Sequence, residues 1–159
     1  MGIQHLAKYN NVYNDSTKKV PFDGDEINHC MYFDFSKTYA VVVSGVTPCG
    51  HMLLNTGGLG GWYFHVAGVY KRPKVMGEKG YRRYLLENQK IELSRTFIPI
   101  PYPEKSNKKL EEIMQKKWLW GILPHNCVVL VEEIIQAGGA NFGLYSNCPA
   151  IERLTTRSK

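Results

Sequence analysis

The chain has 159 residues, 43% of them hydrophobic, and it carries a formal net charge of +6 at pH 7. This length allows one domain to bury about two-thirds of its unfolded surface, so disulfide bonds or metals are not needed to hold it together. No apolar run approaches the roughly 18 residues of a membrane-spanning helix, and there is no repeat or low-complexity tract. The sequence therefore predicts a globular protein without an integral membrane segment.

The first part of the chain is polar and punctuated by turn-forming residues. We expect residues 1–28 to form an irregular or partly helical lead-in, and residues 29–159 to form the core of a single domain. The first residues lack the charged, apolar and small-residue zones of a secretory signal. Export by that route is therefore not expected.

Four segments after the lead-in are rich in β-branched and aromatic residues and are separated by turn signals, such as the glycines at 57–61. This pattern predicts strands, and the short connections favour an antiparallel meander. The predicted strands cover residues 30–35, 38–46, 51–55 and 62–70.

Helical and extended patterns alternate in the second half of the chain. Tyr81, Tyr84 and Leu85 fall on one face of a predicted helix, and Ser106 or Asn107 is the expected cap of the next helix. Strands followed by helices predict an α+β fold, an antiparallel sheet packed against helices. The predicted elements are helices over 77–89, 105–117 and 127–137, an extended stretch over 92–100, and one or two short strands within 142–145 and 149–154.

A cysteine, Cys127, stands at the start of the last and most apolar of these helices. Asn126 can cap the helix by accepting a backbone N–H bond, and Gly138 and Gly139 can end it in a left-handed turn. The amides at a helix N-terminus stabilise a thiolate and can lower a cysteine pKa from about 8.5 to roughly 3.5–7.5. Cys127 is therefore a candidate nucleophile, expected to be partly exposed at the helix start.

Two histidines in the predicted strands, His51 and His65, are candidate partners of this thiol. Because they flank one glycine-rich turn, they can face each other across a hairpin. If both lie on the face that packs against the cysteine helix, one imidazole can take the thiol proton while the other orients it. A histidine suits the role of base because its pKa lies near neutrality.

These motifs resemble the permuted branch of the NlpC/P60 papain-like superfamily, which includes the lecithin:retinol acyltransferase-like proteins. Members place a histidine at the start of a core strand, a second polar residue on the next strand, and a late Asn-Cys at a helix start. This chain has His51, His65 and Asn126-Cys127 in that order, within roughly residues 38–140. The resemblance implies a permuted papain-like fold with Cys127 as nucleophile, His51 as base and His65 as the orienting residue. The Cys127 backbone N–H would contribute to an oxyanion hole.

The resemblance also implies a catalytic domain that cleaves an amide or peptide bond through a cysteine acyl-enzyme. Peptidoglycan peptides are the leading substrate class. A small basic protein without a secretory signal resembles antibacterial effectors, which are made in the cytoplasm and delivered by a specialised secretion system. A cognate immunity protein or a secretion component would then be a partner. No cofactor is expected, and the localisation stays open.

Four residues are candidate substrate contacts: Asn126, His125, Trp62 and Tyr63. His125 could replace His51 as the base, but a residue two positions before a nucleophile normally points away from it. A role in a loop or in specificity is therefore favoured for His125.

Two other functions remain open. One is a lipid acyl hydrolase or acyltransferase of the same fold, in which Trp62, Tyr63, Trp118 and Trp120 would touch a bilayer. Packing of these aromatic side chains in the core is the simpler reading, and the acyltransferase subgroup has Glu-His-Phe where this chain continues with Val128-Val129. The other function is a non-catalytic binding domain.

The chain has four cysteines, at Cys30, Cys49, Cys127 and Cys148. Free thiols are expected, because this density is far below that of a disulfide-stapled scaffold, although a Cys127–Cys148 disulfide would silence the nucleophile. His29-Cys30 and Cys49-Gly-His51 together offer two nitrogens and two sulfurs. Adjacent strand residues point to opposite faces, however, so no metal site is expected.

The net positive charge favours an anionic partner. The basic clusters are short and no nucleic-acid-binding motif accompanies them, so nucleic acid is not expected, and a solvated face is the simpler interpretation. The clusters lie at 71–74, 82–83, 108–109 and 116–117.

Overall fold

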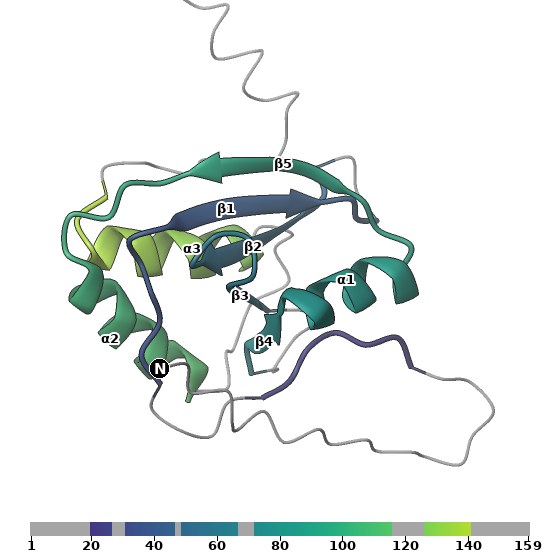
Figure 1. The fold of residues 1–159 in the computed structure, drawn as a ribbon, viewed down its shortest axis with the longest axis horizontal. Coiled ribbons are helices and arrows are strands. Elements are labelled where there is room, and N and C mark those ends of the chain that lie inside the picture. Colours follow the sequence, from purple (N-terminus) through teal and green to yellow (C-terminus); the bar gives the residue numbers. More distant parts are fainter. Residues whose placement is uncertain (1–19, 27–30, 47–48, 67–71, 116–125, 141–159) are drawn as a thin grey trace, which may run out of the picture.

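A five-stranded antiparallel sheet forms the centre of the structure (Figure 1), which confirms the α+β class. The computed structural model describes residues 20–26, 31–46, 49–66, 72–115 and 126–140. The strand order is β4-β3-β2-β1-β5, so β2 is central and β5 joins the outer side of β1. The strands are β1 (Thr38–Val43), β2 (His51–Thr56), β3 (Trp62–His65), β4 (Lys74–Gly77) and β5 (Glu92–Phe97).

Three helices pack against the two faces of this sheet: α1 (Glu78–Glu87), α2 (Pro103–Met114) and α3 (Asn126–Ala137). Side chains alternate along a strand, so a central strand contributes to both faces. In β2, Met52 and Leu54 belong to a buried cluster with α2 and α3, whereas Leu53 packs with Tyr81 and Tyr84 of α1. The sheet is therefore buried on both sides.

The segment before β1 is not the strand predicted over 30–35. Residues 31–37 adopt no strand in the part of the chain that the structure describes. Phe33 and Phe35 are buried in the cluster with α2 and α3, and the Phe33 N–H donates to Asn107 Oδ1 over 2.8 Å. The aromatic residues of this segment anchor it against α2 instead of pairing it with the sheet.

Strand β4 is absent from the sequence prediction, although it pairs antiparallel with β3. It has four residues and runs directly into α1, so its alternating pattern is too short to recognise. On its outer side, Val75 exchanges two backbone hydrogen bonds with Asp25 of the lead-in. Part of the lead-in therefore belongs to the folded core. The predicted terminal strands within 142–145 and 149–154 lie outside the described residues.

Helix α2 starts earlier than the predicted 105–117, with Pro103 in its first turn, where a missing N–H costs nothing. Ser106 and Asn107 lie buried inside the helix and do not cap it. Ser106 Oγ donates to the carbonyl of Ile134 in α3 over 2.7 Å, and Asn107 Oδ1 receives the Phe33 N–H. These two polar side chains join α2 to its neighbours.

Helix α3 ends in the left-handed turn predicted for it. Gly139 has φ +85°, and the N–H groups of Gly139 and Ala140 donate to the carbonyls of Gln136 and Ile135 over 2.9 and 3.1 Å. This is the Schellman pattern of helix termination. The helix begins at Asn126, the residue expected as its cap, whose side chain lies outside the part of the chain that the structure describes.

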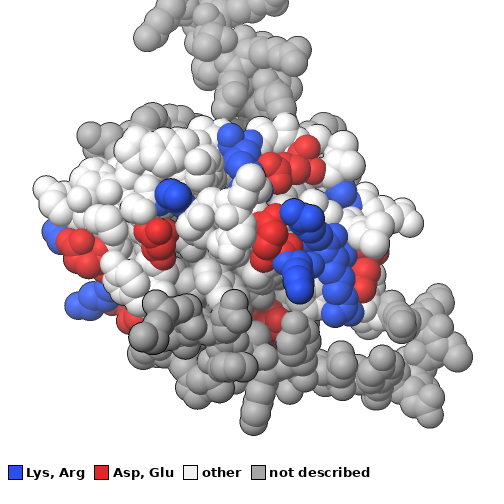
Figure 2. Space-filling model, in the orientation of Figure 1, with Lys and Arg blue, Asp and Glu red and all other residues white. Residues whose placement is uncertain are grey.

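Acidic side chains lie among the Lys and Arg side chains on the face shown in Figure 2. The basic pair at 82–83 is compensated within α1, because Arg82 lies 3.6 Å from Glu78 and Arg83 lies 2.6 Å from Glu87. Exposed pairs of this kind contribute little to stability. They favour the interpretation of this cluster as a solvated face over a dedicated anion-binding surface.

The substitution Gly138→Ala tests the packing of α2 against α3. A β-carbon at Gly138 would overlap Ser106 Oγ and lie 2.6 Å from Ile100 Cγ2, so the hydrogen bond from Ser106 to Ile134 would break. We expect the free energy of unfolding to fall by about 1–3 kcal/mol in urea denaturation. Gln136→Ala, on the exposed side of α3, should change it by less than about 0.5 kcal/mol. Equal effects of the two substitutions would contradict this packing argument.

Candidate functional site

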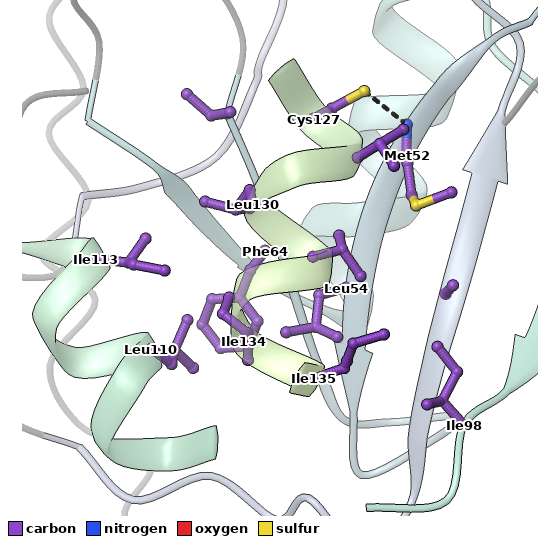
Figure 3. Close-up of a cluster of buried hydrophobic side chains, with 14 of the residues drawn as sticks. Met52, Leu54, Phe64, Ile98, Leu110, Ile113, Cys127, Leu130, Ile134 and Ile135 are labelled. Atoms are coloured by element: carbon purple, nitrogen blue, oxygen red, sulfur yellow. Dashed lines mark hydrogen bonds between the residues drawn. The ribbon is translucent and has the colours of Figure 1, made fainter. Parts of the chain in front are cut away.

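Cys127 lies in the first turn of α3, with its sulfur beside the backbone of β2 (Figure 3). The residue is only 6% exposed, so the predicted partly exposed position is wrong. The backbone N–H of Met52 donates to Cys127 Sγ over 3.5 Å. The sulfur is therefore held against the backbone of β2 at Met52, the residue that follows His51.

The short pairing between β2 and β3 leaves the Met52 N–H free to contact Cys127 Sγ. β2 pairs with β3 only from Leu54 to Thr56, so Met52 lies beyond the paired region. A buried backbone N–H needs an acceptor, and here the thiol sulfur at the start of α3 serves as one. The end of the β2–β3 pairing thus determines where the helix can bring its cysteine.

The rings of His51 and His65 are joined by a hydrogen bond. His51 Nε2 and His65 Nδ1 are 2.8 Å apart, and His65 Nε2 is 2.7 Å from the main-chain carbonyl oxygen of Asp23. A carbonyl oxygen only accepts, so a neutral His65 must carry its proton on Nε2. His65 Nδ1 then accepts from the His51 Nε2–H, which leaves His51 Nδ1 as the unprotonated nitrogen of the pair.

Both histidines share one face of the sheet, and this face is the one that α1 covers. His51 and Leu53 lie two residues apart on β2, and Leu53 packs with α1. The ring centroid of His65 is 5.1 Å from that of Tyr84 in α1. The expectation that the histidines face α3 is corrected, because alternation places Met52 on the α3 side and His51 on the other. The Cys127 sulfur contacts the histidine end of β2 through the backbone N–H of Met52.

Desolvation keeps both imidazoles neutral. His51 is partly exposed by surface area, but protein atoms surround its ring, and this desolvation lowers its pKa to about 3, with contributions from His65 and the Lys90 ammonium. His65 is completely buried, which lowers its pKa, although the hydrogen bond to Asp23 acts in the opposite direction. The histidine pair is therefore uncharged at neutral pH.

Burial also raises the pKa of the Cys127 thiol, and this effect outweighs the backbone N–H groups of Met52 and Val128 that favour the thiolate. The predicted lowering of the Cys127 pKa by the helix start is therefore wrong. These amide contacts, together with the N–H of Cys127 itself, do not replace the hydration that a thiolate loses on burial. The resting site holds a thiol and two neutral imidazoles.

Of the two aromatic residues proposed as substrate contacts, Tyr63 lies in the core and Trp62 is half-buried and packed against it. Tyr63 is fully buried and stacks on Tyr81 with ring centroids 3.9 Å apart. Trp62 packs edge-on against Phe33, with ring centroids 6.0 Å apart. Neither a substrate nor a bilayer would reach Tyr63 in this arrangement. The candidates His125, Trp118 and Trp120 lie outside the described residues.

Cysteine pairing also bears on the site. Cys127 carries a free thiol, which contradicts a Cys127–Cys148 disulfide. Cys49 is disulfide-bonded, so the free thiol predicted there is wrong and Cys49 is not available as a thiolate ligand. Among the described residues, no three His, Cys, Asp or Glu side chains come together in a way that could hold a metal ion. Cys30 and Cys148 lie outside those residues.

A polar cluster that the sequence did not predict crosses the α1 face beside the histidines. Arg95 Nη2 donates to the Tyr63 hydroxyl over 2.8 Å, the Tyr63 hydroxyl donates to Glu78 over 2.9 Å, and the Tyr81 hydroxyl donates to Glu92 over 2.7 Å. Glu92 and Arg95 share this face because the pairing of β5 with β1 is shifted by a bulge between them. Only the strand register reveals this cluster.

None of the described helices is both long enough and apolar enough to cross a membrane. Comparison of the chain with protein-family models, with curated proteins and with solved structures found no match. The functional proposal therefore depends on the geometry of Cys127, His51 and His65.

Acid should destabilise the protein because the buried histidines are neutral. A histidine in the unfolded chain titrates near pH 6.5, whereas His51 in the folded protein has a pKa of about 3. Between these values the unfolded chain binds more protons, so stability falls as the pH falls, by about 1.4 kcal/mol per pH unit for each such histidine. Urea denaturation between pH 6 and 4 should show a slope that His51→Asn reduces by about this amount. Identical slopes for the two proteins would contradict a neutral buried His51.

The raised pKa of Cys127 should be visible in its reactivity. Only the thiolate reacts with iodoacetamide, so the alkylation rate of Cys127 in the unliganded protein should still be increasing above about pH 8.5. Mass spectrometry of the peptide that contains Cys127 would follow the rate between pH 5 and 10. A plateau between pH 5 and 8 would show a stabilised thiolate and would contradict the effect of burial.

Proposed function

We propose that this protein is a cysteine hydrolase in which Cys127 attacks an amide or peptide carbonyl and His51 is the general base. The observation that carries the proposal is the chain of hydrogen bonds from the Asp23 carbonyl through His65 to His51. It ends next to Met52, the residue whose N–H binds Cys127 Sγ. The Met52 contact of the thiol and the histidine pair thus lie at adjacent residues of β2, which supports their assignment as nucleophile, base and orienting group.

The hydrogen-bond pattern supports a specific role for each imidazole nitrogen. The Asp23 carbonyl holds the Nε2 proton of His65, and His65 Nδ1 holds the Nε2 proton of His51. His51 Nδ1 is then the lone pair that can accept the thiol proton. His65 acts as a positioning residue, because it fixes the tautomer and the orientation of His51 without taking the proton itself.

The neutral resting state determines the order of events. Because the thiolate is disfavoured by burial and His51 is a weak base, the thiol proton moves to His51 Nδ1 as the bond between Sγ and the carbonyl carbon forms. The tetrahedral intermediate then expels the amine, which leaves with the proton from His51. Water attacks the thioester, gives a proton to His51, and the C–S bond breaks as Cys127 recovers its proton.

The order of the elements supports a permuted papain-like fold for this chain. The two histidine strands, β2 and β3, precede the cysteine helix α3 in the sequence, and α3 packs on the same sheet that carries both histidines. Val128 and Val131 bury the apolar side of this helix in that cluster. The Cys127 backbone N–H, at the start of α3, would supply one donor of an oxyanion hole.

Peptidoglycan peptides are the substrate class that we propose, with an antibacterial effector as the biological role and an immunity protein or secretion component as partner. The proposed substrate class, role and partner all come from the resemblance to NlpC/P60 proteins. The buried position of Tyr63 gives less support to a lipid acyl hydrolase, because that function needs aromatic side chains at a membrane surface.

The experiment that tests this function measures peptidoglycan cleavage and growth after export of the protein to the bacterial periplasm. The native protein should release muropeptide fragments and stop growth. Cys127→Ala and His51→Ala should each reduce the cleavage rate by at least about 100-fold. Ser94→Ala, on the exposed strand β5, is the matched control and should keep full activity.

Undiminished killing by both Cys127→Ala and His51→Ala would reject the hydrolase. Absence of cleavage by the native protein, together with slow acylation of Cys127 by simple esters, would favour a non-catalytic binding domain.

A further inference from the structure

The two outer strands of the sheet, β4 and β5, differ in what covers them. On the outer side of β4, Val75 uses both its backbone N–H and its carbonyl to bond Asp25, and the strand runs directly into α1. Strand β5 lies at the opposite edge (Figure 1), and no described residue forms a backbone hydrogen bond with its outer side. Five of its six residues are exposed. An open edge of this kind can pair with another strand.

The backbone groups that β5 offers are those of Arg95 and Phe97. The Ile98 N–H donates to the Thr38 carbonyl over 2.9 Å, so Ile98 is bonded toward β1. In an antiparallel pair, residues that bond to the neighbouring strand alternate with residues that do not. Thr96, two residues before Ile98 in the same register, is therefore also bonded toward β1. Arg95 and Phe97 direct their N–H and C=O groups away from the sheet.

Apolar side chains are exposed along the same edge. Ile91, Leu93 and Phe97 are 65%, 48% and 52% exposed. An exposed strand edge that also carries apolar side chains is an aggregation hazard, and proteins normally cover it or protect it with charge. Covering this edge would bury apolar surface and satisfy backbone groups in one step.

The charged residues of β5 do not protect this edge, because they compensate each other. Arg95 Nε lies 2.8 Å from Glu92 Oε1, and Arg95 Nη2 donates to the Tyr63 hydroxyl over 2.8 Å on the α1 face. The other four residues of β5 are uncharged. The chain carries a net charge of +6, yet this edge is locally neutral. Two copies of the chain can therefore approach each other here without repulsion between like charges.

We propose that β5 pairs antiparallel with β5 of a second copy of this chain, so that the two sheets join into one continuous sheet. The occupant follows from the edges that a copy has available. Asp25 covers β4 at Val75, so within the described residues β5 is the edge that a second copy can offer. Pairing of β5 with itself across a two-fold axis uses both open edges, and the assembly therefore stops at two copies. This inference does not depend on the hydrolase function.

The outward backbone groups select one register for this pairing. Arg95 pairs with Phe97 of the second copy, and each such pair exchanges two backbone hydrogen bonds. Thr96 then lies opposite Thr96 of the second copy, at the two-fold axis. The guanidinium of Arg95 lies beside an aromatic ring, which is a favourable contact. A register centred on Arg95 would instead place two like charges opposite each other.

A cysteine at position 96 tests this register directly. Thr96 at the two-fold axis would be separated from its copy by a Cα–Cα distance of about 4.5 Å, which a disulfide can span. Thr96→Cys should therefore form a covalent dimer when oxidised glutathione accepts the electrons of the two thiols, as seen on a non-reducing gel. Ser94→Cys is the matched control, because it is also exposed on β5 but would lie roughly 13 Å from its copy. Neither Ser94→Cys nor the native protein should crosslink.

A charge at the same position tests the dimer without a covalent bond. Sedimentation velocity of the native protein should show twice the mass of the chain, with a dimer fraction that rises with concentration. Thr96→Lys places two ammonium groups opposite each other and should weaken the dimer by about tenfold or more. Ser94→Lys adds the same charge away from the axis and should retain the dimer. Both positions are exposed, so both variants should keep the native circular dichroism spectrum.

Hydrogen exchange identifies what covers the edge. If a second copy covers it, protection of the Arg95 and Phe97 amides should rise with concentration in step with the dimer. Equal protection at every concentration would show that another segment of the same chain covers β5, and would overturn the proposal. A native protein that stays monomeric would also overturn it. A dimer that survives Thr96→Lys, or that crosslinks equally through Ser94→Cys, would contradict pairing through β5 in this register.

Discussion

Burial of β2 on both faces is the constraint on which the rest of the structure depends. Every residue of β2 after His51 is buried, so alternation assigns its apolar side chains either to the cluster with α3 or to the cluster with α1. Met52 goes to α3 and Leu53 to α1. A shift of one residue in register would exchange these faces and would carry His51 away from His65. The placement of the proposed site is therefore tied to the packing of the whole sheet.

The same burial sets the chemistry that the site can perform. In water, a thiol beside two imidazoles could rest as an ion pair, but here the loss of hydration favours the neutral form of all three groups. In a pair of neutral imidazoles, the tautomer of each ring decides which nitrogen can accept a proton, and hydrogen bonds fix the tautomer. Such hydrogen bonds are stronger in a dry interior than in water. The Asp23 carbonyl can for this reason define which nitrogen of His51 is free.

The position of that carbonyl depends on the lead-in. The Phe22 N–H donates to Glu87 Oε2 over 2.7 Å, Asn88 Nδ2 donates to the Phe22 carbonyl over 2.7 Å, and Asp25 bonds to Val75 of β4. These contacts hold residues on both sides of Asp23 against α1 and the edge of the sheet. A segment without regular secondary structure thus supplies the acceptor at the far end of the histidine pair. Its fixed position explains how a backbone oxygen can orient a side chain.

The sequence by itself determined the α+β class, the left-handed end of α3 and three candidate residues, Cys127, His51 and His65. These features depend on local periodicity, turn chemistry and residue type, which are properties of short segments. Only the tertiary structure decided that the histidines face α1, that Asp23 orients His65 and that Met52 holds the sulfur. The last two contacts join residues 42 and 75 positions apart, so no local pattern encodes them. The direction of each pKa shift also came from the folded state, because desolvation depends on what surrounds a group in space.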